Sequence, residues 1–282
     1  MAQDWLLDSA EDVAARIPDG VQIAVGVDGV GVAMETTRAL IRRGVRGLHL
    51  VCAPLSGLQA DLLIGAGCVA TLETSAITFG EYGTPHRFHD ALKRGAIVLK
   101  DATCPAIYAA LEAGRKDIPF IPLRGLIGSD LMVHRPDWKV IDNPFSAPFA
   151  ASDPIALLPA IRPDYALLHA PYADRDGNIF IGRRRDLALI AQASRHGALV
   201  TVEQVRDDLD LMASEETAAG ALPALYVEAA AVAPRGAWPL GLGDCYEIDE
   251  AHFHRYGEMA RTADGFARYL DEFVHCRREA AE

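Results

Sequence analysis

The sequence predicts an α/β fold with an open, mostly parallel sheet flanked by helices. Short β-rich runs alternate with helical patterns along most of the chain, which is typical of parallel strands joined by covering helices. Half of the 282 residues are hydrophobic, enough for a sizeable core. Glycines follow two of the helical patterns, at Gly44 and Gly114, and a left-handed cap is expected at Gly44.

The first half of the chain opens with an amphipathic helix that has Ser9 as its expected cap. The next strand is expected to end in a glycine-rich turn at 26–31, which leads into a helix. Strands are expected at 21–25, 48–52, 68–72, 96–99 and 118–122, and helices at 35–43 and 104–112.

In the second half, Asp176-Gly177 lies between two apolar runs and predicts a tight turn, because glycine supplies the positive φ without strain. The proline-rich stretch at about 135–160 is expected to be an irregular crossing between two halves of one domain, 1–282, with a helical C-terminal tail. Further strands are expected at 165–170, 179–181, 198–202 and 224–233, and helices at 186–194, 252–258 and 266–274.

Composition narrows the function. The chain carries 39 acidic and 27 basic residues, a formal net charge of −12. A negative surface repels phosphate backbones and anionic lipids, so neither nucleic acid nor a membrane is an expected partner. No apolar run approaches the roughly 18 residues of a membrane span, and the start lacks the basic region of a signal peptide. The five cysteines form no C-x-x-C pair, which favours buried free thiols and a cytoplasmic location.

Ligands of open parallel sheets bind beyond the carboxyl ends of strands, so the loops after strands are the candidate sites. The turn at 26–31 places Gly26, Gly29 and Gly31 between a strand and a helix. Closely spaced glycines let a ligand approach the backbone, and amides at a helix start favour negative charge. The order is not G-x-G-x-x-G, and a purely structural turn explains these glycines about as well.

Two later loops carry polar candidates. Asp101 follows a strand, where a carboxylate suits catalysis, although capping of the next helix is the commoner role. Arg124, Gly128 and Ser129 share another loop, and a cation, a hydroxyl and glycine-exposed amides suit a carboxylate or phosphate. The alternative is a glycine-bent surface loop with Arg124 paired to an acid.

Other candidates are weaker. His169 ends an apolar strand, where a histidine is more often a satisfied core residue than a catalyst. His252 and His254 match no standard zinc spacing, so no metal is expected. The chain contains neither a nucleophile elbow nor a Walker loop.

The order of several motifs resembles the alpha subunit of class I coenzyme A transferases, specifically the glutaconate-type transferases and the steroid-ring-opening hydrolases. The resemblance covers nearly the whole chain. It rests first on the strand ending in His169, the D-x-x-G-N turn at 174–178 and the glycine turn after the first strand. The other matching segments are 63–67 (the approach to the next strand), 74–83 with Arg87-Phe88, 124–130, and 234–239 with Tyr246 and Asp249. Two departures are Gly26-Val27 in place of paired glycines and the lack of a proline near Glu35.

The resemblance implies a CoA thioester as substrate, no permanently bound cofactor, and a beta subunit of the same family as partner in a heterodimer or heterotetramer. In such transferases a glutamate attacks the thioester, giving an anhydride and then an enzyme–CoA thioester. That glutamate lies in a Ser-Glu-Asn-Gly-like motif of the beta subunit, and this chain has no such motif. The chain is therefore expected to be active only with its partner, and to contribute the glycine turn and the loop at 124–130 to CoA and acyl binding.

Asp101 separates two chemistries. In the ketoacid transferases, the loop that corresponds to 101–103 resembles Gln-Gly-Thr, and the glutamine donates a hydrogen bond to the oxyanion. An ionised aspartate has no donor and repels that charge, so Asp101 fits a general base of a CoA-thioester or ring-opening hydrolase better. The expected function is nevertheless CoA transfer between an acyl-CoA and a free carboxylic acid. The hydrolase subunit and a non-catalytic CoA-binding subunit are the alternatives. Sugar-phosphate isomerisation would need a basic cluster, of which only Arg124 is available.

Overall fold

The computed structural model describes residues 5–29, 31–146 and 152–276. Its main sheet has the order β1-β15-β13-β11-β2-β3-β5-β7, with every neighbouring pair parallel. Two short strands, β12 (Ile179–Phe180) and β14 (Ala221–Leu222), extend it in antiparallel pairing from β11. The prediction of a mostly parallel sheet is confirmed. The parallel strands are β1 (Leu6–Leu7), β2 (Gln22–Val25), β3 (Leu48–Cys52), β5 (Val69–Thr74), β7 (Val98–Asp101), β11 (Tyr165–Asp174), β13 (Ala198–Arg206) and β15 (Val227–Val232).

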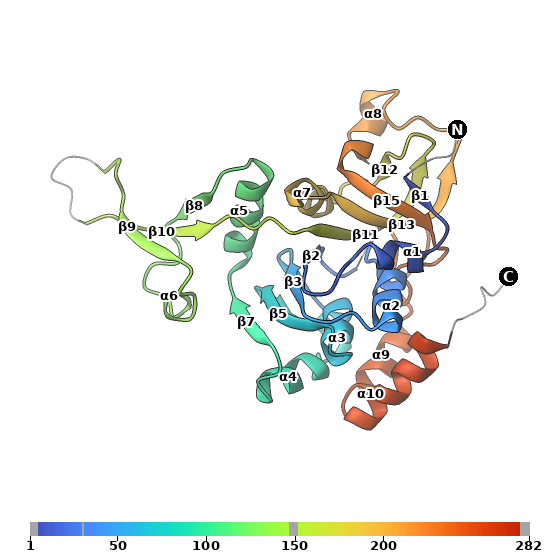
Figure 1. Ribbon diagram of the computed structural model, residues 1–282, viewed down its shortest axis with the longest axis horizontal. Helices are drawn as coiled ribbons and strands as arrows, with labels where there is room; N and C mark the ends of the chain where they lie inside the picture. Colours follow the sequence, from blue (N-terminus) through green and yellow to red (C-terminus); the bar gives the residue numbers. More distant parts are fainter. Residues whose placement is uncertain (1–4, 30, 147–151, 277–282) are drawn as a thin grey trace.

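Helices cover both faces of the sheet (Figure 1). Side chains alternate along each strand, so Ile23 and Val25 enter one core cluster and Ala24 enters the other. The first cluster is shared with α1 (Ala10–Ala15), α2 (Met34–Arg43), α3 (Leu58–Gly65), α4 (His86–Lys93), α9 (Glu250–Met259) and α10 (Ala263–Leu270). The second is shared with α5 (Cys104–Arg115) and α7 (Arg185–Ala193).

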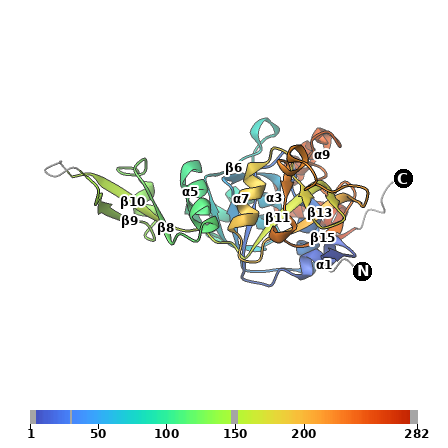
Figure 2. The same cartoon turned by 90° about the horizontal axis from the view of Figure 1, so that it is seen from above.

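A three-stranded antiparallel sheet forms an arm that extends away from the main sheet in both views (Figures 1 and 2). It has the order β8-β10-β9, and Ala156 of β10 pairs with both Leu123 and Val140. The segment expected to be irregular at 135–160 therefore contains two strands, although 147–151 lie outside the described residues. The strand expected at 118–122 joins this arm. Its elements are β8 (Phe120–Leu123), α6 (Leu131–His134), β9 (Lys139–Asp142) and β10 (Pro154–Pro159).

A buried ion pair fastens the arm to the main sheet. Arg135, which follows α6, donates to Glu73 of β5 at 2.7 Å and to the backbone oxygen of Asp101 at 3.1 Å. Its guanidinium also lies 4.3 Å from the ring centre of Trp138. Burial alone would raise the pKa of Glu73, but His49, Lys100 and Arg135 outweigh it and the pKa is lowered. The base of the arm is thus tied to the strand ends at which Asp101 lies.

Local signals in the sequence correspond well to the structure. Ser9 caps α1 by accepting a hydrogen bond from the Asp12 amide at 3.2 Å. Gly44 and Gly177 adopt φ values of 77° and 87°, as the predicted helix end and turn require. The segment 63–67 holds the last turn of α3 and the turn into β5. The remaining short elements are β4 (Leu55–Ser56), β6 (Ala76–Ile77), α8 (Glu215–Ala218), and helical turns at Gly80–Tyr82, Ala224–Tyr226 and Asp271–His275.

The cysteines only partly follow the expectation. Cys52 and Cys68 are buried free thiols, but Cys104, Cys245 and Cys276 are exposed. Each exposed cysteine lies at an element end or in a loop, where an apolar neighbourhood in sequence does not imply burial. No helix among the described residues has both the length and the apolarity needed to cross a membrane.

The helical tail is held by a buried carboxylate. Asp61 of α3 accepts hydrogen bonds from the Tyr256 hydroxyl at 2.6 Å and the Phe88 amide at 2.7 Å, so α9 and α4 are both attached to α3. Burial raises the pKa of Asp61 to about 6, and the hydrogen bonds offset this effect only in part.

This raised pKa predicts a specific pH dependence. The folded state holds the Asp61 proton more tightly than the unfolded state does, so this residue's contribution to stability falls as the pH rises from about 4 to about 6. Asp61→Asn stays neutral throughout. We therefore expect the variant to gain about 3 kcal/mol on wild type over that interval. Urea unfolding of both proteins at several pH values measures the free energy of unfolding. A difference between the two proteins that stays constant with pH would contradict the prediction.

Candidate active site

The chain reverses its direction of winding at β2. Helix α2 leads from β2 to β3 on one face of the sheet, whereas α7 leads from β11 to β13 on the other. The crevice between β2 and β11 is therefore a topological switch point, the place at which open α/β sheets bind ligands. The turn at 26–31 follows β2 directly and lies at this crevice.

Two of the predicted glycines in this turn are required by close packing. A Cβ at Gly26 would lie 2.7 Å from Leu187 of α7, and one at Gly31 would lie 2.8 Å from the backbone oxygen of His169. Gly29 and Gly31 have φ values of 126° and 77°, which favour glycine. Val30 lies outside the described residues. Only glycine allows the turn to lie this close to both α7 and β11.

Asp28 holds the turn from the other side. Its carboxylate accepts hydrogen bonds from the Ser56 hydroxyl at 2.9 Å and from the Leu58 amide at the start of α3 at 2.6 Å. The residue is half-buried, but the carboxylate itself is enclosed, and this desolvation raises its pKa. Asp28 thus caps α3, whose own N-cap residue is Gly57. Its side chain is therefore directed to the start of α3.

The backbone of the turn remains available. Within the described part of the chain, the amides of Val27, Asp28 and Gly29 donate to no other residue. Arg184 donates to the Val27 backbone oxygen at 3.1 Å and forms an ion pair with Asp186 at 2.6 Å. The turn therefore offers hydrogen-bond donors beside an Arg–Asp pair, an arrangement suited to a carbonyl oxygen or an anion.

A second group of polar side chains lies along the same edge of the sheet. Asp101 ends β7 and is paired in register with Thr74, the last residue of β5. Ser75 follows Thr74, and its hydroxyl lies 3.2 Å from the thiol of the exposed Cys104. The ends of β5 and β7 thus bring together a carboxylate-bearing residue, a hydroxyl and a thiol.

Asp101 does not cap α5, because Thr103 does so by accepting from the Ala106 amide at 3.3 Å. From the described part of the chain, the Asp101 carboxylate accepts one hydrogen bond, donated by the neighbouring Ala102 amide at 2.9 Å. The residue is half-buried. The capping role that base rates favoured is therefore wrong, and the carboxylate keeps acceptor positions at the edge of the sheet.

The third predicted group lies on the arm. Arg124 forms an ion pair with Asp153, which also accepts from Asn143. The Ser129 hydroxyl donates to the Leu126 backbone oxygen at 2.7 Å, and Gly128 has a φ of 82°. Among the described residues, no hydrogen bond or ion pair joins Arg124 or Ser129 to the glycine turn or to the Asp101 carboxylate. The structure thus does not gather all the predicted residues around one point, and the role of this loop stays a prediction.

His169 was expected to be a satisfied core residue at the end of a strand. It is a satisfied core residue, but β11 continues to Asp174, so His169 lies inside the strand. Its ring is fully buried, with Nδ1 2.9 Å from the Thr201 hydroxyl and Nε2 2.7 Å from Glu203. The Tyr246 hydroxyl donates to the same Glu203 oxygen at 2.8 Å. The role of Glu203 was missed, although a charged residue inside the apolar run at 198–205 was a signal that could have identified it.

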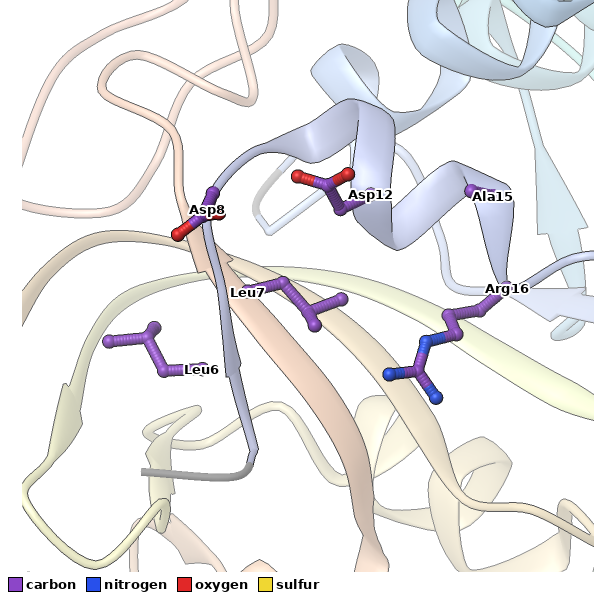
Figure 3. Close-up of a pocket in the computed structure, with 6 residues that line it drawn as sticks. All are labelled: Leu6, Leu7, Asp8, Asp12, Ala15 and Arg16. Atoms are coloured by element: carbon purple, nitrogen blue, oxygen red, sulfur yellow. The ribbon is translucent and has the colours of Figure 1, made fainter. Parts of the chain in front are cut away.

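A hollow of about 370 Å³ lies near the N-terminus, between β1 and α1 (Figure 3). It is at the β1 end of the strand order, whereas the polar loops follow β2, β3, β5 and β7. Its lining offers two carboxylates and a guanidinium at an open surface and includes none of the candidate-site residues. We therefore assign the candidate site to the strand ends. The lining residues are Leu6, Leu7, Asp8, Asp12, Ala15 and Arg16.

A family model described as coenzyme A transferase matches residues 7–232. This chain belongs to the coenzyme A transferase family. The transferase chain is 30% identical to the A-type subunit of 3-oxoadipate CoA-transferase of Pseudomonas knackmussii, over 98% of this chain and 96% of the relative. It is 26% identical to the IpdA subunit of the cholesterol ring-cleaving hydrolase of Rhodococcus jostii, over 94% and 90%.

The transferase fold is also seen in a solved structure. Glutaconate CoA-transferase from Acidaminococcus fermentans superposes with a TM-score of 0.84 at 23% identity, over 96% of this chain and 89% of that chain. At this identity the likeness supports the fold alone. Because the match to the 3-oxoadipate CoA-transferase relative spans nearly the whole length of its A-type subunit, the transferase chain is of the same type and is one subunit of an enzyme.

Proposed function

We propose that this chain is the alpha subunit of a heteromeric CoA-transferase that moves CoA between an acyl-CoA thioester and a free carboxylic acid. The observation that carries the proposal is the nearly full-length match to the A-type subunit of a CoA-transferase. The nucleophilic glutamate is assigned to a beta subunit, since this chain has no Ser-Glu-Asn-Gly-like motif. The CoA thioester is the substrate, and no permanently bound cofactor is invoked.

The proposed chemistry divides one exchange into acyl-transfer steps. The partner's glutamate attacks the thioester carbonyl, the CoA thiolate leaves, and an acyl–glutamyl anhydride remains. The thiolate then attacks the glutamyl carbonyl, which releases the first carboxylate and leaves a glutamyl–CoA thioester. The acceptor carboxylate then attacks the glutamyl–CoA carbonyl and displaces the CoA thiolate, which gives a new anhydride. The thiolate attacks the acceptor's acyl carbonyl in that anhydride, which releases the new acyl-CoA and frees the glutamate. Each addition develops an oxyanion, and the amides of Val27, Asp28 and Gly29 are donors of the kind that stabilise it.

A hydrolase subunit is the second candidate, and a specific observation favours it. Among the residues that the structure describes, the Asp101 carboxylate accepts only from the neighbouring amide, so it has room to take a proton from water or from a substrate carbon. The relative from Rhodococcus jostii is a ring-cleaving hydrolase subunit. A non-catalytic CoA-binding subunit is the third possibility. We also propose a cytoplasmic location, because the free thiols of Cys104 and Cys245 suit a reducing compartment.

The proposal can be tested on the partner subunit. Incubation of the complex with acyl-CoA should leave a CoA thioester on a glutamate of the beta subunit, which hydroxylamine cleaves and borohydride traps. Mass spectrometry of the separated subunits measures the adduct. A turning-over complex that never carries the adduct would favour the hydrolase.

The loop on the arm provides a separate prediction. Arg124 is largely exposed and uses part of its guanidinium on Asp153, so other donors remain for an acyl carboxylate. If the loop binds substrate, Arg124→Met should raise KM for the acyl substrate about five- to tenfold, and Ser129→Ala should raise it less. Asp153→Asn is the matched control, because it breaks the same ion pair and keeps the cation. Equal KM values for Arg124→Met and Asp153→Asn would mean that the loop is structural.

A further inference from the structure

Three polar side chains from separate segments form one connected group behind the glycine turn. His169 of β11 and Glu203 of β13 are joined at 2.7 Å, and Tyr246, from the loop before α9, donates to Glu203 at 2.8 Å. Thr201 completes the group at 2.9 Å from His169. Along their strands, His169, Thr201 and Glu203 alternate with residues of the α5–α7 core, so they lie on the face of the sheet that carries α2.

The proton positions in this group follow from its chemistry. Burial would raise the pKa of Glu203, but hydrogen bonds from His169, the Arg235 amide and Tyr246 lower it, so Glu203 is ionised and only accepts. Burial lowers the pKa of His169, so its ring is neutral. Nε2 therefore carries the proton that Glu203 accepts, and Nδ1 accepts from the Thr201 hydroxyl. Tyr246 donates to Glu203 and accepts from the Ala237 amide at 3.1 Å.

The group also holds the turn at 235–236. The second oxygen of Glu203 accepts from the Arg235 amide at 2.7 Å, and Arg235 has a φ of 54°, unusual for a residue with a side chain. A Cβ at the next residue, Gly236, would lie 2.5 Å from the His169 ring. The turn therefore rests directly against the histidine.

Two backbone hydrogen bonds hold the segment between the glycine turn and α2, one from this turn and one from β11. The Gly236 backbone oxygen accepts from the Glu35 amide at 2.8 Å, and the His169 amide donates to the Gly31 backbone oxygen at 2.9 Å. Residues 31 and 35 bound the link between the glycine turn and α2. The side chains of the polar group thus hold the turn at 235–236, which accepts from the start of α2, while the backbone of β11 at His169 holds the glycine turn.

We infer that His169, Glu203 and Tyr246 are positioning residues that hold the glycine turn in the geometry needed to bind the CoA thioester. Replacing a buried polar group by an apolar cluster of similar size often leaves the free energy of unfolding unchanged, so stability alone does not explain a polar group at this position. The additional effect is the geometry that its hydrogen bonds fix. None of the three residues is assigned contact with substrate. The expected effect on turnover rests on the proposed function. The effect on the geometry of the turn does not.

Tyr246→Phe tests the inference, because it removes one hydroxyl and keeps the ring. In the isolated chain we expect the Arg235 and Glu35 amides to exchange hydrogen roughly tenfold faster, the effect of losing one hydrogen bond to a charged group. In the complex with its beta subunit, KM for the CoA thioester should rise about five- to tenfold, while kcat stays within about twofold. Tyr172→Phe is the control, since Tyr172 lies on the same strand as His169 and its ring stacks on that of Phe180, with the ring centres 4.8 Å apart. It should change none of these values.

A second pair of variants distinguishes a positioning role from a general loss of stability. Thr201→Val should reproduce the faster exchange, because Nδ1 loses its donor, and Thr201→Ser should restore wild-type values. If Tyr246→Phe and Thr201→Val lower the melting temperature but leave amide exchange and KM unchanged, the group is merely structural and the inference is wrong. The exchange measurement uses the chain alone, so it decides the positioning role even if the complex transfers no CoA.

Discussion

Purified alone, this chain should fold but show no CoA transfer. The reason is chemical, because it has no Ser-Glu-Asn-Gly-like motif to supply the covalent nucleophile, and it matches the A-type subunit of a CoA-transferase along nearly its whole length. Removal of an enzyme's nucleophile typically costs on the order of 10⁶ in kcat. An assay with an acyl-CoA and a free acid should therefore remain at background until the beta subunit is added, and the mixture should elute as a larger species in gel filtration.

The control for this experiment is the beta subunit with its proposed glutamate replaced by glutamine. It should form the same complex with the same elution volume and remain inactive, which separates assembly from chemistry. Circular dichroism should show that the isolated chain is folded before partner is added. Full turnover by the chain alone would contradict the assignment of the nucleophile to the partner.

Asp101→Asn should distinguish the two chemistries of the assembled enzyme. If the enzyme is a transferase, as proposed, Asp101 is not needed for proton transfer, and kcat should stay within several-fold of wild type. If it is a hydrolase, loss of the general base should lower kcat by about 10²- to 10⁴-fold with little change in substrate binding. Asparagine keeps the size of the side chain and its acceptor for the Ala102 amide, so the fold is preserved in both cases.

Asp142→Asn is the matched control for this substitution. Asp142 ends a strand as Asp101 does, but it lies on the arm, is exposed and bonds to Ser152. It should leave kcat unchanged in either chemistry. A complex that carries the glutamyl–CoA adduct and remains active as Asp101→Asn would exclude the general-base role, whereas a loss of about 10²-fold without any adduct would overturn the transferase proposal.

The sequence by itself predicted most of the main fold. Ser9, Gly44 and Gly177 gave correct local boundaries, because a cap or a positive φ depends only on a few neighbouring residues. The alternation of strand and helix patterns predicted the parallel sheet, because each parallel strand needs a crossover connection. The position of the glycine turn after β2 followed from the same alternation.

Tertiary structure decided what the local pattern could not. The arm forms because β10 pairs with β8 and β9. The strand at 118–122 was predicted, but its pairing partners depend on contacts between separate segments that no single stretch of sequence specifies. Thr103 caps α5, and the expectation that Asp101 would do so was wrong, because the backbone begins the helix two residues after Asp101.

The polar group of His169, Glu203 and Tyr246 is the clearest case. Each residue is ordinary in its own stretch of sequence, and Glu203 is separated from Tyr246 by 43 positions. They meet only because β11 and β13 are neighbours in the sheet and the chain returns past β15 to place Tyr246 beside them. Sequence determines elements through interactions within a few residues, whereas a buried polar group depends on side chains that only the packed sheet brings within hydrogen-bonding distance.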